Sequence, residues 1–102
     1  MEKKKLFISQ PMRGRTDKEI LAQREDAITK ARELFNEEVV ILDSYFRDYT
    51  PSTDNIALEY LGESLKLLAQ ADVVYFAKGW SSARGCIIEH HCAVEYGIKI
   101  IF

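Results

Sequence analysis

The chain has 102 residues, of which 47% are hydrophobic and 29% charged, and this composition is typical of one globular domain with a single modest core. Its formal net charge of −2 at pH 7 provides no basic field to attract nucleic acid, so we expect no nucleic-acid partner. No run reaches the roughly 18 apolar residues of a membrane-spanning helix, and the start "MEKKKLFIS" has too few apolar residues for a signal peptide.

Because no segment is long and apolar enough to span a bilayer, we expect no membrane partner. The two cysteines, Cys86 and Cys92, lie six positions apart in a segment of helical character. Residues i and i+6 point to different sides of a helix, so a disulfide between them is geometrically unfavourable. Free thiols are typical of a reducing compartment, and we expect a cytoplasmic location.

The N-terminal half predicts a strand, a helix and a second strand. The apolar run "KLFIS" (5–9) precedes a loop that starts "QPMRG", which is the pattern of a buried strand followed by a turn. A helix is expected from Thr16 or Asp17, because Thr16 and Glu19 have the spacing of a capping box. The β-branched run "EVVILDS" (38–44) then predicts a strand that is covered on both faces.

The C-terminal half continues this alternation. After the polar and aromatic loop "YFRDYTPSTDN", a helix is expected over about 55–70, followed by the strand "DVVYFAK" (72–78). The inward face of this helix should be formed by four leucines, Leu58, Leu61, Leu65 and Leu68. The stretch "SSARGCIIEHHCAVEYG" (81–97) predicts a third helix that is closed by Gly97 as C′ residue, and "IKIIF" predicts a last strand.

The order β-α-β-α-β-α-β predicts an α/β fold, and residues 1–102 form one domain. We expect three layers, in which a Rossmann-like or flavodoxin-like parallel sheet of four to five strands, in the order 2-1-3-4, has helices on both faces. Ligands of such sheets bind outside the carboxyl ends of the strands. The loops "SQPMRG", "DSYFRDY" and "KGWSSARG" should therefore surround one cleft.

The first of these loops suggests an anion site. It continues as "SQPMRGRT" and carries Ser9, Gln10, Arg13, Gly14 and Arg15 ahead of a helix N-terminus, where backbone N–H groups and the helix dipole favour an anion that arginine also binds well. The loop is neither GxGxxG nor a Walker A sequence, so the sequence gives little support for a dinucleotide-binding protein or a P-loop protein. An ordinary turn with exposed arginines remains an equal alternative.

The third helix contains a carboxylate, Glu89, where an apolar residue would be expected. A metal site with Cys86 and His90 is one explanation, but His91 diverges by about 100° from His90 and no second ligand pair such as CxxC occurs. We expect neither a metal nor a cofactor. Near a helix start the dipole favours the ionised carboxylate, as a nucleophile requires. A carboxylate that only binds backbone or Arg84 is the alternative.

A second carboxylate, Glu63, lies in the helix that precedes the third strand and borders the expected cleft. Two carboxylates that flank one bond, a nucleophile and an acid/base, are the arrangement of retaining glycosidases. The alternatives are that Glu63 is one more exposed helical glutamate or that nearby Glu59 takes the role.

These residues resemble the nucleoside 2-deoxyribosyltransferase superfamily, which includes nucleoside 5′-monophosphate N-glycosidases. The resemblance covers essentially the whole chain and rests on "LFISQPMRG", "LGESLKLLAQADVVYF" and "SARGCIIEHHCAVEYGIKII". The last segment is the most specific, because Gly85, Glu89, Ala93, Gly97 and Lys99 all match the pattern of the family.

The resemblance implies that Glu89 attacks the anomeric carbon of a nucleoside or nucleotide. It places Glu63 where the family has an aspartate that assists protonation of the leaving base. Residues expected to contact the substrate are Ser9, Gln10, Met12, Arg13, Gly14, Asp43, Tyr45, Trp80, Ser82, Arg84 and Gly85.

The function expected on these grounds is cleavage or transfer of the N-glycosidic bond of a nucleoside or nucleoside 5′-monophosphate, with water or a second base as acceptor. Because Glu63 stands in place of the aspartate, a nucleotide-binding sensor without turnover is the alternative. The resemblance also implies a homodimer or larger homo-oligomer, with the apolar helix that carries Leu58, Leu61 and Leu65 as a candidate contact face.

Overall fold

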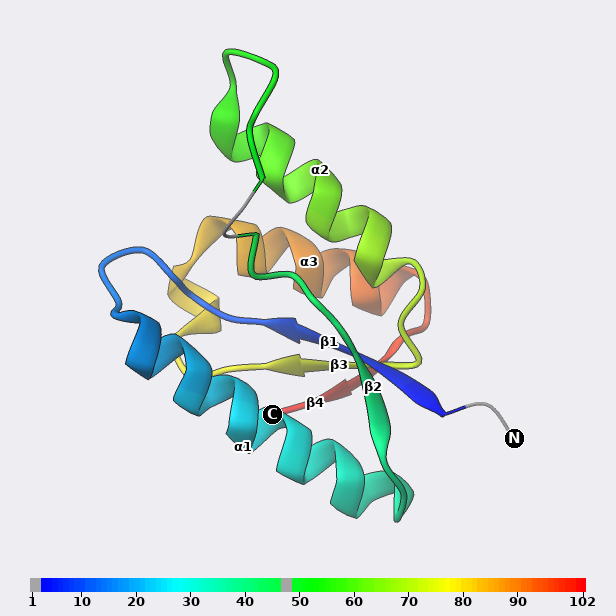
Figure 1. Ribbon diagram of the computed structural model, residues 1–102. Coiled ribbons are helices and arrows are strands. Elements are labelled where there is room, and N and C mark those ends of the chain that lie inside the picture. Colours follow the sequence, from blue (N-terminus) through cyan, green and yellow to red (C-terminus); the bar gives the residue numbers. More distant parts are fainter. Residues whose placement is uncertain (1–2, 47–48) are drawn as a thin grey trace.

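The computed structural model describes residues 3–46 and 49–102. In this part of the chain strands and helices alternate (Figure 1), and they comprise β1 (Lys4–Ser9), α1 (Asp17–Phe35), β2 (Val39–Leu42), α2 (Ile56–Leu68), β3 (Val73–Phe76), the short 3-10 helix η1 (Trp80–Ser82), α3 (Arg84–Glu95) and β4 (Lys99–Ile101). The described strands form one parallel sheet in the order β2-β1-β3-β4, which confirms the predicted topology.

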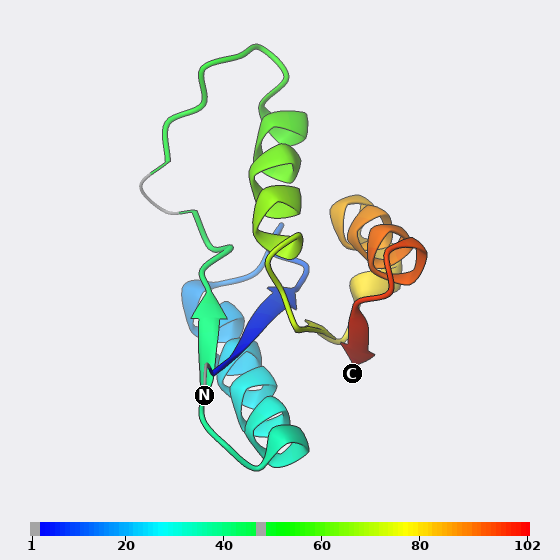
Figure 2. The same cartoon turned by 90° about the vertical axis from the view of Figure 1, so that its right-hand side faces the viewer.

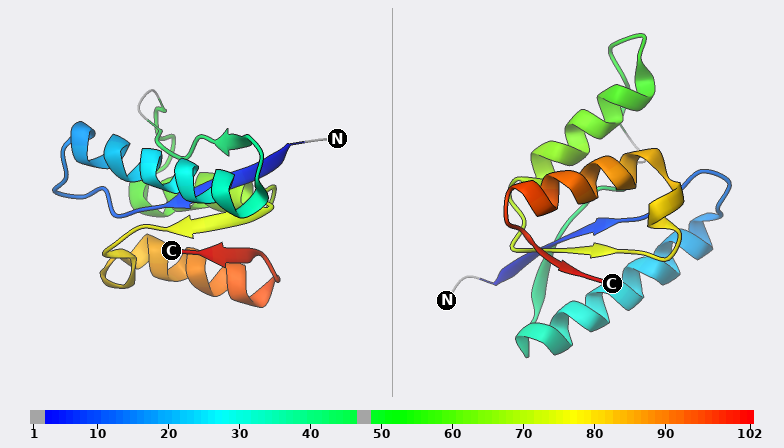
Figure 3. Two further views of the ribbon diagram at one scale, coloured as in Figure 1. Left: turned by 90° about the horizontal axis from the view of Figure 1, so that it is seen from below. Right: turned by 180° about the vertical axis from the view of Figure 1, so that it is seen from behind.

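The helices cover both faces of the sheet. Figure 3 shows α1 and α3 on opposite sides of the strands, and Figure 2 shows α2 standing above the sheet's carboxyl edge beside α3. Side chains of a strand alternate between the two faces. Phe7 on β1 therefore packs with residues of α2 and α3, whereas its neighbours Leu6 and Ile8 pack against α1.

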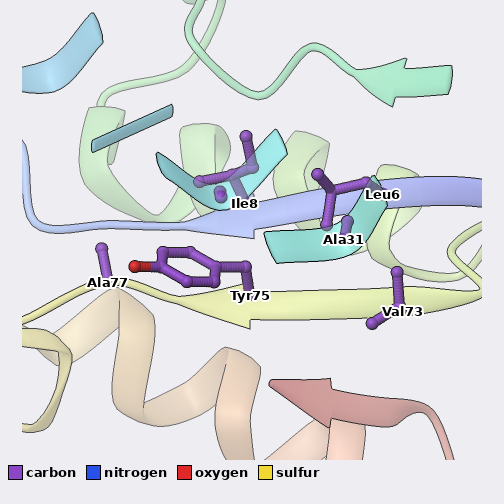
Figure 4. Close-up of a cluster of buried hydrophobic side chains, with 7 residues drawn as sticks. Leu6, Ile8, Ala31, Val73, Tyr75 and Ala77 are labelled. Atoms are coloured by element: carbon purple, nitrogen blue, oxygen red, sulfur yellow. The ribbon is translucent and has the colours of Figure 1, made fainter. Parts of the chain in front are cut away.

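The core between the sheet and α1 is built from aliphatic side chains and the ring of Tyr75 (Figure 4). Leu6 and Ile8 of β1 lie beside Val73 and Tyr75 of β3, and Ala31 of α1 covers them. The Tyr75 hydroxyl donates to Asp26 Oδ2 at 2.8 Å, so its polar end is satisfied at the rim while its ring is buried. This layer fixes α1 across the two central strands.

Helix α1 begins as predicted, with Thr16 as N-cap and a complete capping box with Glu19. Its inner face differs from an ordinary apolar stripe, because Arg24 lies on it between Ile20 and Ala27 and is only 8% exposed. The long side chain reaches the carboxyl edge of the sheet, where it meets Gln10 and Asp43.

The prediction for the inner face of α2 is wrong at its first turn. Leu68 is buried and Leu61 and Leu65 are partly buried, but Leu58 is 60% exposed. The N-terminal half of α2 extends past the ends of the strands (Figures 1 and 2), so its first leucine has no strand to pack against.

The predicted third helix is divided in two. Ala83 has the extended dihedral angles φ −110° and ψ 120°, and it separates η1 from α3. Gly97 follows the C-cap residue Tyr96 with φ +70°, which confirms its C′ role. Cys86 and Cys92 are both free thiols. Among the described helices none is long and apolar enough to cross a bilayer.

Candidate active site

A cleft of about 1290 Å³ opens at the carboxyl edge of the sheet. Its floor and walls come from the end of β1, from the loops that follow β1, β2 and β3, from α2 and from the start of α3. Eight of the predicted site residues line it, namely Gln10, Met12, Arg13, Tyr45, Ser82, Arg84, Gly85 and Glu89. The predicted convergence of three loops on one cleft is therefore present in the structure.

Glu89 is the buried carboxylate of this cleft, with 7% of its surface exposed. Ser9, at the end of the central strand β1, donates a hydrogen bond from Oγ to Glu89 Oε1 at 2.6 Å. In the described part of the chain every fully buried side-chain oxygen has a hydrogen-bond partner. In Glu89 the partner, Ser9, binds Oε1, so Oε2 is not fully buried. Oε2 therefore keeps access to the solvent in the cleft.

The ionisation of Glu89 differs from the sequence prediction. Burial raises its pKa from 4.5 to about 7, and the hydrogen bond from Ser9 opposes this rise. We expected the helix dipole to favour the ionised form. Glu89 is the sixth residue of α3, beyond the first turn where the dipole acts, so desolvation dominates.

Cys86 lies one helical turn before Glu89 and lines the same cleft. Burial raises the pKa of its thiol to about 11, and the negative charge of Glu89 adds to this rise, whereas hydrogen bonding with Ser9 lowers the pKa. Near neutral pH Cys86 is therefore a protonated thiol. Its sequence position suggested a metal ligand, but its neighbours are a serine and a carboxylate.

Three arginines line the cleft, and one of them, Arg15, is partly buried. Arg15 packs so closely on Gly79 that a Cβ there would lie 2.8 Å from Arg15 Nη2, and Gly79 has φ +94°. Arg13 and Arg84 lie on the same cleft with exposed side chains. Arg15 was part of the predicted anion loop, but sequence alone did not distinguish it from Arg13.

Gln10 anchors the loop after β1. Its side-chain nitrogen donates to the carbonyl oxygen of Ile20 and to Gln23 Oε1, both at 3.1 Å, and its oxygen accepts from Arg24 at 3.4 Å. Because these bonds use the donors and the acceptor of the amide, Gln10 shapes the cleft that it lines.

The wall formed by α2 and the loop before it is aromatic. Phe46 and Tyr60 line the cleft with their rings 6.1 Å apart and nearly parallel. The Tyr60 hydroxyl donates to the carbonyl oxygen of Tyr49. Glu59 also fastens this loop, since it accepts from Tyr49 Oη and from the backbone of Ser52 and Thr53. Hydrogen bonding from the Thr53 side chain, together with that from Tyr49 and from the Ser52 backbone, lowers the pKa of Glu59 to about 2. Sequence analysis missed Phe46 and Tyr60, whose only signal was their place in a loop and helix beside the cleft.

The structure does not bring Glu63 into the cleft. Its Oε1 accepts from Lys66 Nζ at 3.1 Å, and Ser64, the next residue, is the one that lines the cleft. Successive helical residues point about 100° apart, so only one of the two can face Glu89. The expected pairing of Glu63 with Glu89 is therefore absent from the described residues, whose only cleft-lining carboxylate is Glu89.

Three further predicted contacts also lie elsewhere. Trp80 stacks on His90 with 4.3 Å between the ring centres and lines a separate hollow on the outer side of α3. Asp43 accepts from Arg24 and from the backbone N–H of Tyr45, which stabilises the turn after β2. Gly14 is exposed and provides a turn with φ +76°.

Ser9, the remaining predicted contact, lies beneath Glu89. Gly85 faces open space, since a Cβ added there meets no atom within 4 Å. Among residues 3–46 and 49–102 no group of three or more metal-ligating side chains is close enough to hold an ion.

Comparison with known proteins assigns a family. Residues 4–102 match a family model described as "Domain of unknown function (DUF4406)". No curated protein and no solved structure matches the chain.

Proposed function

The chain belongs to the DUF4406 family of domains of unknown function, and we propose from its site that it cleaves the N-glycosidic bond of a nucleoside 5′-monophosphate or nucleoside. The observation that carries this proposal is the buried Glu89 carboxylate at the cleft, with one oxygen held by Ser9 and the other accessible. A fixed carboxylate with one free oxygen is suited to attack an electrophilic carbon.

The proposed reaction has two steps. Glu89 Oε2 forms a bond to the anomeric carbon while the carbon–nitrogen bond breaks, and the base leaves with the bonding electron pair and takes up a proton. Water then attacks the glycosyl–enzyme ester, which releases the sugar and restores the carboxylate. A second base as acceptor would make the same intermediate serve transfer.

The walls of the cleft support a nucleotide as ligand. Arginines at its edge suit a phosphate, and Arg15 is the least exposed of them. On the other side the rings of Phe46 and Tyr60 offer an apolar surface to a planar base. A cleft of about 1290 Å³ has room for both parts of the molecule.

The departing base needs a proton, and Glu63 is badly placed to deliver it. Its carboxylate is paired with Lys66 outside the cleft. We propose that the proton comes from water in the cleft. The same observation favours the second candidate, a nucleotide-binding module that keeps the cleft without turnover.

One experiment separates the two candidates. The protein is incubated with a panel of nucleosides and 5′-monophosphates, free base is followed by chromatography, and the melting temperature is measured with each compound. We expect base release that Glu89→Gln abolishes and Glu63→Gln retains. A rise in melting temperature without base release in any sample would instead establish the binding module.

The pH dependence provides a further check. Glu89 must be ionised to attack, and its pKa is raised to about 7. We therefore expect kcat/KM to rise about tenfold per pH unit well below pH 7 and to level off above it. A profile that falls as the pH rises through 7 would mean that Glu89 acts as an acid and would contradict the proposed nucleophile.

A further inference from the structure

Ser9 is unusually well fixed for a side chain beside a reacting group. It is 1% exposed, its strand is central in the sheet, and its carbonyl oxygen accepts from the Ala77 N–H at 2.9 Å. Its hydroxyl is therefore presented to Glu89 by two hydrogen-bonded strands. A donor held in this way does not have to reorganise when the charge of its partner changes.

The single proton of the Ser9 hydroxyl has two neighbours that it could face, Glu89 and Cys86. Burial keeps Cys86 protonated, since its pKa is raised to about 11, and a thiol sulfur is a weak acceptor. The carboxylate is the stronger acceptor, and the 2.6 Å distance between Oγ and Oε1 is that of a charge-assisted bond. The serine proton is thus directed to Glu89, while the thiol remains free to donate to Ser9 Oγ.

We propose that Ser9 is a positioning residue for Glu89. The Ser9 hydroxyl binds Oε1 of the ionised carboxylate more strongly than Oε1 of the protonated group, and it leaves Oε2 as the attacking oxygen. The catalytic part of this inference rests on the proposed function. Its effect on the carboxyl group itself does not, because it follows from the hydrogen bond alone. Hydrogen bonding to the charged form of an acid favours that form.

Other ionisable groups face the same cleft from every neighbouring element. They are Arg13 and Arg15 after β1, Tyr45 after β2, Tyr60 on α2, and Arg84 and Cys86 on α3. The pKa of Glu89 is raised by its burial and lowered by the hydrogen bond from Ser9. Removal of the Ser9 hydroxyl should therefore change the ionisation of Glu89 without compensation from an arginine.

The test is a carbon-13 NMR titration of the glutamate carboxyl groups, in which the Glu89 signal is assigned by its loss in Glu89→Gln. In Ser9→Ala we expect the pKa of Glu89 to rise by about 1–2 units, which is the size of effect of one hydrogen bond to a charged group. Ser44→Ala is the matched control. It removes another buried serine hydroxyl, which donates to the carbonyl oxygen of Ile8 at 3.0 Å, and should leave the pKa of Glu89 unchanged.

Ser9→Cys keeps the size of the side chain with a weaker donor and serves if the alanine variant does not fold. The pKa of Glu89 should then lie between the values in the wild type and in a protein without the hydroxyl. An unchanged pKa of Glu89 in a folded Ser9 variant would overturn the proposal, and so would an equal rise in Ser44→Ala.

Activity distinguishes this proposal from the function on which it rests. At pH 6 we expect kcat/KM of Ser9→Ala to fall by about 10- to 100-fold, with part of the loss recovered at high pH as Glu89 ionises. If the pKa shifts but the wild type releases no base from any compound, the proposed function fails and the role of Ser9 in ionisation stands. If base is released but the pH profile of Ser9→Ala matches that of the wild type, the positioning role fails.

Discussion

Glu89 is an ionisable side chain in a buried position that the fold would normally fill with an apolar residue. It lies on the inner face of α3 with Cys86 and Ala93, where an apolar residue would pack without cost. Its burial is tolerated because the carboxyl group can hold a proton, and Ser9 supplies the polar contact. The contribution of such a group to the stability of the folded protein depends on pH.

Replacement of Glu89 by glutamine should show this dependence. The pKa is about 7 in the folded protein and near 4.5 without its surroundings, so the favourable contribution of the protonated group is complete below pH 4.5 and is lost as the pH rises through 7. The free energy of unfolding of Glu89→Gln, relative to the wild type, should therefore increase by about 3 kcal/mol between pH 4.5 and pH 8.

The measurement is urea denaturation at a series of pH values. Glu95→Gln is the matched control, because it removes a carboxylate from the exposed side of the same helix. A difference between Glu89→Gln and the wild type that stayed constant over this range would show that folding does not raise the pKa of Glu89.

At the scale of elements, the helix on one face of the sheet supports the loops at its edge. Arg24 extends from α1 to Gln10 in the loop after β1 and to Asp43 in the turn after β2. Its side chain is 10% exposed. One buried guanidinium thus links two of the three loops that surround the cleft.

We expect Arg24→Met to lower the free energy of unfolding by about 1–3 kcal/mol, because it keeps the apolar stem but removes a donor of the buried Gln10 oxygen. Arg32→Met is the control on the same helix. It breaks a surface ion pair with Glu38, in which the arginine is 49% exposed, and should cost no more than about 1 kcal/mol. Equal losses in urea denaturation would show that the Arg24 contacts stabilise nothing beyond an exposed pair.

The elements themselves were readable from local patterns. The alternation of apolar runs with amphipathic segments predicted the order and topology of the sheet, and the Thr16 capping box fixed the start of α1. What failed depended on tertiary position. Leu58 has the spacing of a core residue but is exposed, and Glu63 has the sequence neighbours of a cleft residue but pairs with Lys66 and does not line the cleft.

The site was predictable where a residue lies in a loop that follows a strand or in the N-terminal half of a helix. Glu89 and the arginine loop belong to this class. The bond between Ser9 and Glu89 was not predictable, because it joins residues 80 positions apart and no local pattern reports such a pair. The rise in the pKa of Glu89 follows from the same packing and was missed for the same reason.

At the scale of the whole molecule, we propose that the protein forms a homodimer through the free end of α2. Ile56 and Leu58 are 53% and 60% exposed there, and exposed apolar groups of this kind are typical of contact surfaces when they occur together. Sedimentation equilibrium should show a dimer that Leu58→Lys converts to a monomer. Leu34→Lys is the control on α1, where Leu34 is 43% exposed, and should remain dimeric. A wild-type monomer at all concentrations would contradict this assignment.

The distance along the chain between Ser9 and Glu89 has a consequence for how the protein is made. During synthesis β1 emerges early, but it is flanked in the sheet by β2 and β3, which follow it by some thirty and sixty residues. The helix that carries Glu89 emerges after all three strands. The cleft is thus among the last features that can be completed, because α3 is synthesised after the three strands that precede it.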